Sequence, residues 1–103
     1  MHADAIAQEY SKKVRTALGP RIKDIILFGS RARGRCKEFS DYDMMIIVDK
    51  RDKSLLETVV TIEVDILDKY ERLVGSIVYE QGEWERKRQS PLGMNIKKDG
   101  VRL

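Results

Sequence analysis

The chain has 103 residues, with 20 basic and 17 acidic side chains and a formal charge of +3. This length fits one domain, which we assign to residues 1–103, and argues against a separate substrate domain. The basic excess is confined to residues 83–103, so it gives little support for a nucleic-acid partner. One cysteine excludes an internal disulfide, and no apolar run reaches membrane-spanning length. We therefore expect a soluble cytoplasmic protein.

The first half of the chain predicts one helix and two buried strands. Residues 3–18 place apolar side chains at helical spacing and are followed by Gly19-Pro20, which stops a helix. Residues 22–28 and 44–48 are short and mostly apolar, as is typical of strands buried on both faces. Only a single helical turn is expected at residues 55–57.

A third strand is predicted further along the chain. Residues 61–67 alternate between polar and apolar side chains, and such alternation is typical of a strand. Glu63 and Asp65 would then project from the same face. A helix is expected over residues 70–79, although Gly75 weakens that prediction.

The last part of the chain predicts short elements. For residues 80–89 the sequence leaves a continued helix and a turn into a short strand both open. Ser90-Pro91 is typical of a helix start, and we expect a short helix over residues 92–98. After a turn, residues 101–103 are expected to form an edge strand.

A phosphate-binding turn is predicted at the end of the first strand. Gly29 lets the backbone approach a ligand closely, and Ser30 adds a hydroxyl and a backbone N–H group. Arg33 follows, and a guanidinium can bind two phosphate oxygens at once. A Gly-Ser pair alone is more often a plain turn, so the prediction depends on its surroundings.

Two carboxylates begin the second strand. Asp41 and Asp43 are two residues apart, so their side chains project from the same face of a strand. Carboxylates this close repel each other unless a cation lies between them, and Mg²⁺ prefers such oxygen ligands. A third carboxylate from a neighbouring strand would complete a two-metal site. Taken alone, an Asp-x-Asp pair is more often part of a solvated loop.

The two motifs together are more specific than either alone. Ten residues separate Gly29-Ser30 from Asp41-Tyr42-Asp43, with Arg33-Gly34 between them and a buried strand on each side. In this arrangement the chain resembles the minimal nucleotidyltransferases of the DNA polymerase beta superfamily, over roughly its whole length in element order. The resemblance implies an α+β fold, a small mixed β-sheet with helices packed on one side.

The resemblance also implies how a substrate is held. Gly29 and Ser30 would bind the β- and γ-phosphates of a nucleoside triphosphate, for which ATP is expected, and Arg33 would contact phosphate. The expected reaction transfers a nucleoside monophosphate to a hydroxyl group.

Metal binding is implied in the same way. Asp41 and Asp43 would carry two Mg²⁺ ions together with a third carboxylate. We assign the third position to Asp65, because residues 64–67 match the family's apolar-Asp-apolar pattern, and keep Glu63 as the alternate. Asp65 would then also accept the proton of the attacking hydroxyl.

Stand-alone members of this family are commonly antitoxins, each paired with a helical HEPN-type toxin whose tyrosine they adenylylate. The resemblance therefore implies such a partner for this chain. Two alternatives stay open: a binding module that neutralises its partner by contact, and a transferase that acts on an RNA end. The choice of nucleotide and the oligomeric state, as a homo- or hetero-oligomer, cannot be read from the sequence.

Overall fold

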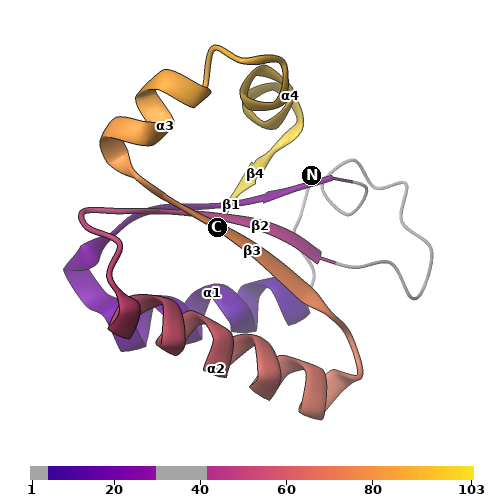
Figure 1. Cartoon of the computed structure of the whole chain (residues 1–103). Coiled ribbons are helices and arrows are strands. Elements are labelled where there is room, and N and C mark those ends of the chain that lie inside the picture. Colours follow the sequence, from indigo (N-terminus) through magenta and orange to yellow (C-terminus); the bar gives the residue numbers. More distant parts are fainter. Residues whose placement is uncertain (1–4, 30–41) are drawn as a thin grey trace.

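The computed structural model describes residues 5–29 and 42–103 (Figure 1). Within these ranges four strands form one mixed sheet, in the order β3-β2-β1-β4. None of the helices found there is long and apolar enough to cross a membrane. The elements are, in chain order, α1 (Ala5–Leu18), a 3₁₀ turn (Gly19–Arg21), β1 (Ile22–Phe28), β2 (Tyr42–Val48), α2 (Lys53–Tyr70), β3 (Val74–Glu80), α3 (Gln81–Lys87), α4 (Pro91–Asp99) and β4 (Val101–Arg102).

The two strands predicted in the first half are confirmed. β1 has the predicted bounds, and β2 begins two residues earlier than predicted, at Tyr42. β1 pairs antiparallel with both β2 and β4, and β2 pairs parallel with β3. The sheet is therefore mixed, as expected, and β1 and β2 lie at its centre.

The two long helices, α1 and α2, cover one face of the sheet (Figure 1). Alternate residues of β2, from Tyr42 to Val48, pack against them in the main core. The phenol of Tyr10 on α1 is buried and hydrogen-bonds the hydroxyl of Ser76 on β3. Burial raises the pKa of Tyr10 well above its ordinary value, so this side chain stays a neutral anchor.

The predicted strand over residues 61–67 is wrong, because these residues belong to helix α2. Ile62 and Ile66 are buried at helical spacing, whereas Val64 is 48% exposed on another side of the helix. Val64 is apolar although it lies outside the buried stripe of the helix. Together with Ile62 and Ile66 it makes residues 61–67 alternate between polar and apolar, as a strand does. The helix is longer than the single turn expected, and Asp52 caps its start by accepting a hydrogen bond from the backbone N–H of Leu55.

The predicted helix over residues 70–79 is also wrong. Helix α2 ends at Tyr70, where Glu71 takes a left-handed conformation with φ of 54° and donates its N–H to the carbonyl of Leu67. The chain then turns into β3. Because α2 separates the two strands, β3 can lie parallel to β2.

Two short helices, α3 and α4, lie over the other face of the sheet, so the expectation of helices on one side only is wrong (Figure 1). Residues 80–89, left open above, contain α3, which begins with a capping box between Glu80 and Glu83. The expected helix start at Ser90-Pro91 is confirmed, since the Ser90 hydroxyl accepts a hydrogen bond from the N–H of Gly93. The expected terminal strand is confirmed as β4, at the edge next to β1.

Candidate active site

The sheet face that bears α3 and α4 also carries Asp43. Side chains alternate along a strand, so Asp43 points away from its neighbours Tyr42 and Met44, which are buried against α1 and α2. Asp43 is half-buried at the start of β2. Its partners in register are Phe28 on β1 and Gly75 on β3. These three residues form a row across the sheet, and the candidate site lies at this row.

The turn after β1 closes against this carboxylate. Gly29 has φ of +78°, a conformation that side chains other than glycine rarely adopt. A Cβ atom built on Gly29 would collide with the carboxylate oxygen Oδ2 of Asp43. The expected glycine turn and one of the expected carboxylates are therefore in contact, as a phosphate and metal site requires.

Three of the residues assigned to the site lie outside the described residues: Ser30, Arg33 and Asp41. Their assigned roles stay predictions. In the sequence, Asp41 precedes Asp43 by two residues, and Ser30 directly follows Gly29.

The assignment of Asp65 as the third carboxylate requires correction. The structure places Asp65 on the exposed side of α2, where it lines a groove of about 670 Å³ between α1 and α2. Glu63, the alternate, is half-buried on the same helix. Both residues lie on the face of the sheet opposite to Asp43. The structure thus does not bring them to the site, because the strand that was expected to carry them is a helix.

The neighbouring strand is instead β3, and the residue beside Asp43 on that strand is Gly75. A Cβ atom added to Gly75 would meet no atom within 4 Å. Space for a third carboxylate therefore exists on this face, and no carboxylate of residues 5–29 or 42–103 fills it. Sequence reasoning missed this position, since only the parallel register of β3 identifies it.

The described residues fit a metal site in part. Asp43 supplies the hard oxygen ligand that Mg²⁺ prefers, and the Gly29 backbone lies close beside it with no side chain between them. No group of three or more potential metal ligands occurs within residues 5–29 and 42–103. A metal ion held here would thus depend on Asp43, on Asp41 two residues before it in sequence, and on oxygens of the substrate.

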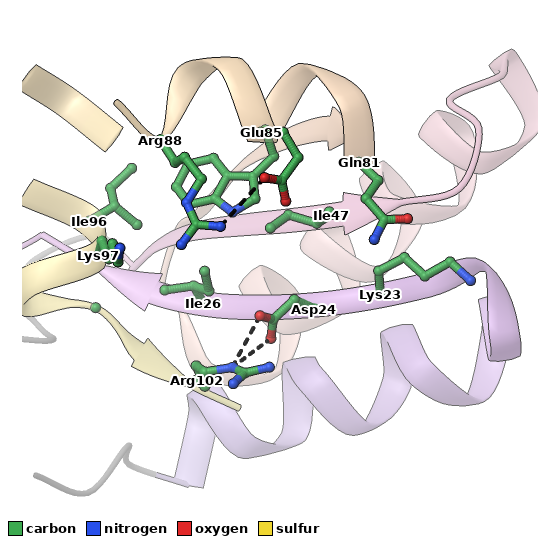
Figure 2. Close-up of a pocket in the computed structure, with 12 residues that line it drawn as sticks. Lys23, Asp24, Ile26, Ile47, Gln81, Glu85, Arg88, Ile96, Lys97 and Arg102 are labelled. Carbon is green, nitrogen blue, oxygen red and sulfur yellow. Dashed lines mark hydrogen bonds and ion pairs between the residues drawn. The ribbon is translucent and has the colours of Figure 1, made fainter. Parts of the chain in front are cut away.

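A cavity of about 480 Å³ lies on the same face, between the sheet and helices α3 and α4 (Figure 2). Ile26 and Ile47 form its floor, while Trp84 of α3 and Ile96 of α4 form its walls. Trp84 stacks on Tyr79 with ring centroids 6.4 Å apart. This cavity could not be predicted from the sequence, because it depends on how α3 and α4 pack.

The rim of the cavity is charged. Two of its cations form ion pairs at the rim (Figure 2): Arg102 binds Asp24 with 3.1 Å between Nε and Oδ2, and Arg88 approaches Glu85 at 3.5 Å. Lys23 and Lys97 complete the set of cations. Four cations thus face two carboxylates around an apolar floor, so the cavity favours a ligand that is both apolar and anionic.

Comparison with known proteins identifies relatives over most of the chain. The family model described as nucleotidyltransferase domain matches residues 7–99. A protein of Methanocaldococcus jannaschii, named as an inferred protein adenylyltransferase, is 36% identical over 78 residues, which cover 74% of this chain and 78% of that protein. A second protein of that organism, with the same kind of name, is 29% identical over 100 residues and covers 97% of this chain and 96% of its own length.

Solved structures share the fold at lower identity. One is a chain of a toxin–antitoxin complex solved with AMP-PNP, at a TM-score of 0.63 and 18% identity, covering 92% of this chain and 70% of that chain. Another comes from the complex of a tri-AMPylated HEPN toxin with an MNT antitoxin of Shewanella oneidensis. Its TM-score is 0.55 at 16% identity, and it covers 94% of this chain and 70% of that chain. At such identities the likeness shows the fold alone.

Proposed function

Because this chain belongs to the nucleotidyltransferase domain family and has the polymerase-beta-like fold, we propose that it transfers AMP from ATP to a hydroxyl group of a protein. The observation that carries the proposal is the contact between the Gly29 turn and the Asp43 carboxylate on one sheet face. Transfer of a phosphoryl-type group needs a phosphate-binding turn and a metal-binding carboxylate side by side. The Gly29 turn and Asp43 are the proposed pair.

Each residue of the site has a proposed part in this reaction. Gly29, Ser30 and Arg33 hold the β- and γ-phosphates, and Asp41 and Asp43 hold Mg²⁺. When bound, Mg²⁺ supplies charge neutralisation at the phosphates and makes a coordinated hydroxyl more acidic. The protein's own contribution is mostly positioning of the two reactants.

The bonds that change follow from the products. The acceptor oxygen forms a bond to the α-phosphorus, and the bond from that phosphorus to the oxygen bridging to the β-phosphate breaks. Pyrophosphate leaves, and the hydroxyl proton is lost. We propose the pair Asp41 and Asp43 as the acceptor for that proton, because β3 has Gly75 beside Asp43 and Asp65 lies on helix α2.

The proposed acceptor is a tyrosine of a HEPN-type toxin, and the chain would act as the antitoxin. Two observations on other proteins support this choice: the M. jannaschii relatives are named as inferred protein adenylyltransferases, and a structural neighbour occurs in complex with an AMPylated HEPN toxin.

One observation favours a second candidate function. Gly75 occupies the place beside Asp43 where β3 could have supplied a third carboxylate. A site with fewer acidic ligands binds metal ions more weakly, so a protein that neutralises its partner by contact alone is the rival proposal.

A transfer assay separates the two candidates. We would incubate the protein with ATP labelled at the α-phosphate, Mg²⁺, and either the protein encoded beside it or RNA. Label on the partner protein is expected for wild type, and Asp43→Asn should reduce its rate at least a hundredfold. Asp65→Asn is the matched control, because it removes a carboxylate from the opposite face and should transfer label at the wild-type rate.

Three other outcomes of this assay would contradict part of the proposal. A stable complex with the partner that forms without transfer, and equally well with Asp43→Asn, would favour the contact-only function. Label on RNA instead of protein would replace the proposed acceptor. Loss of transfer in Asp65→Asn would contradict the structural assignment of the site.

A further inference from the structure

Helix α2 carries two apolar stripes, and only one of them is packed. The buried stripe lies in the main core and consists of Leu55, Val59, Ile62 and Ile66. A second set of apolar side chains is 40–54% exposed and consists of Leu56, Val60, Val64 and Leu67. At about 100° per residue, this second set falls within an arc of about 80°, centred about 125° around the helix from the buried stripe. We call these four residues the exposed stripe.

The exposed stripe is continuous. Its successive members are three or four residues apart, so their side chains are neighbours on the helix surface. From Leu56 to Leu67 it runs about 16 Å along the helix, a length of about three turns. Single exposed apolar residues are common on proteins, whereas a contiguous apolar patch usually marks an interaction site. Helix α2 lies along the outside of the molecule (Figure 1), where a partner can reach it.

Carboxylates border the exposed stripe on both sides. By the same helical geometry, Glu63 lies next to it on one side, and Glu57 and Asp68 lie on the other. Glu57 approaches Lys53 at 3.9 Å. Glu63 and Asp68 form no ion pair with any residue of the described part of the chain. The borders of the exposed stripe therefore carry net negative charge.

We propose that the exposed stripe docks an amphipathic helix of a partner protein, one whose apolar side chains are flanked by lysine or arginine. The shape favours a helix, since the ridges of a straight, convex helix surface pack into the grooves of another helix. The charge favours a basic helix, because its cations would meet Glu63 and Asp68. The apolar contact supplies affinity, and the carboxylates select the partner.

A second copy of this chain fits the exposed stripe less well. Two copies related by a twofold axis would use the same patch on both sides of the contact. With the helices antiparallel, Glu63 of one copy would lie near Glu63 of the other, and Glu57 near Asp68. Like charges that meet in this way oppose association. The same carboxylates disfavour anionic membranes and nucleic acids as ligands of this surface.

The exposed stripe is separate from the candidate active site. Helix α2 covers the sheet face opposite to the one that carries Asp43. A helix docked on α2 would therefore leave the Gly29 turn and Asp43 uncovered. The inference does not rest on the proposed function, and its test needs no ATP.

Stapled helical peptides test the proposal with the full chain. The staple is needed because short isolated helices are marginal in water. One peptide has leucines three and four residues apart with lysines on both sides of them. A second has glutamates in place of the lysines, and a third has alanines in place of the leucines. Fluorescence anisotropy measures each dissociation constant, and we expect the lysine–leucine peptide to bind at least tenfold more tightly than the other two.

Variants of the exposed stripe locate the binding. Val60→Gln combined with Val64→Gln should raise the dissociation constant of the lysine–leucine peptide at least tenfold. Both side chains are about half exposed, so the helix itself should fold as in wild type. Met94→Gln is the matched control, because Met94 is 61% exposed on α4, over the other face of the sheet. It should leave the dissociation constant unchanged.

The bordering carboxylates are tested in the same way. Glu63→Gln combined with Asp68→Asn should weaken the lysine–leucine peptide at least threefold at low salt, and the difference should shrink as salt is added. Asp65→Asn combined with Glu85→Gln is the matched control, since it removes the same number of charges elsewhere. Asp65 lines the groove between α1 and α2, and Glu85 lies on α3. This control should bind the peptide as wild type does.

The proposal would be overturned if none of the peptides binds or if all three bind alike. It would also be overturned if the variant with Val60→Gln and Val64→Gln binds the lysine–leucine peptide as wild type does. Light scattering provides a last check on the occupant. A wild-type dimer that this variant converts to a monomer would show that a second copy, and not a basic partner helix, covers the exposed stripe.

Discussion

At the scale of single residues, Gly29 links the backbone conformation to the proposed chemistry. Two features each require a glycine at this position: the positive φ and the close approach of the Asp43 carboxylate. Each can be tested by substitution. Gly19 also has a positive φ, of +56°, but a Cβ atom there would meet nothing within 4 Å. The chain therefore contains a control for backbone strain without the collision.

We predict that Gly29→Ala and Gly19→Ala both lower the free energy of unfolding, by about 1 kcal/mol each from the left-handed conformation. Only Gly29→Ala should lose tripolyphosphate binding, because the added methyl group displaces the Asp43 carboxylate. Thermal unfolding and calorimetry measure the two effects. Equal ligand affinity in the two variants would contradict the assignment of the turn.

Gly75 gives the second prediction at this scale. Gly75→Asp places a carboxylate beside Asp43, where the structure has room for one. Because an additional oxygen ligand strengthens binding of a hard cation, we predict that the dissociation constant for Mn²⁺, used as a probe for Mg²⁺, falls at least tenfold.

Gly75→Asn is the matched control, since it has the same shape without the charge. Mn²⁺ affinity would be measured by electron paramagnetic resonance, which requires no turnover. If Gly75→Asp and Gly75→Asn bind Mn²⁺ alike, the site does not lie on this side of Asp43.

At the scale of elements, Gly93 determines how α4 packs on α3, because a Cβ atom there would collide with the backbone of Lys87 and Arg88. We predict that Gly93→Ala lowers the free energy of unfolding by about 1–3 kcal/mol, as overpacking of a close contact does, with a fall in Tm of about 4–8 °C per kcal/mol. Gly75→Ala is the control, because nothing lies within 4 Å of a Cβ atom there. A Tm for Gly93→Ala equal to that of the control would contradict the described packing.

The elements also show what could be predicted from the sequence. Strand β1 and helix α4 were predicted because strong local signals bound them: Gly19-Pro20 before β1, and Ser90-Pro91 at the start of α4. Helix α2 was missed because Val64 lies outside its buried stripe, which gave its sequence the period of a strand.

The candidate site likewise contains residues that could be predicted from the sequence and residues that could not. Gly29 and Asp43 lie close to each other in a local motif, and the structure brings them together as predicted. The third position could not be predicted, because it depends on which residue of β3 is in register with Asp43, and β3 itself was taken for a helix. The cavity walls, Trp84 and Ile96, come from two helices whose packing no short motif encodes.

At the scale of the whole molecule, Glu9 joins the first helix to the end of the second. Its carboxylate accepts hydrogen bonds from the Tyr70 hydroxyl at 2.5 Å and from Lys69 Nζ at 3.0 Å. The hydrogen bond from Tyr70, followed by that from Lys69, lowers the pKa of Glu9. The stabilisation is therefore present above the ordinary pKa of a glutamate and is lost as the pH falls through the lowered value.

We predict that Glu9→Gln lowers the Tm at pH 7 and that its difference from wild type shrinks as the pH falls to about 3, below the usual range of glutamate pKa values. Glu57→Gln is the control, because the Glu57 carboxylate is exposed and its ion pair within the described part of the chain, with Lys53, is long at 3.9 Å. It should differ little from wild type across the same range. A Tm difference for Glu9→Gln that does not depend on pH would contradict this role.

The central claim is that the chain transfers the nucleoside monophosphate and not the terminal phosphate. The most direct measurement compares two reactions of the protein with Mg²⁺ and the proposed partner, one with ATP labelled at the α-phosphate and one with ATP labelled at the γ-phosphate. We predict label on the partner only from the α-labelled ATP, with the γ-label released as pyrophosphate. Label on the partner from the γ-labelled ATP, or from neither, would contradict the account.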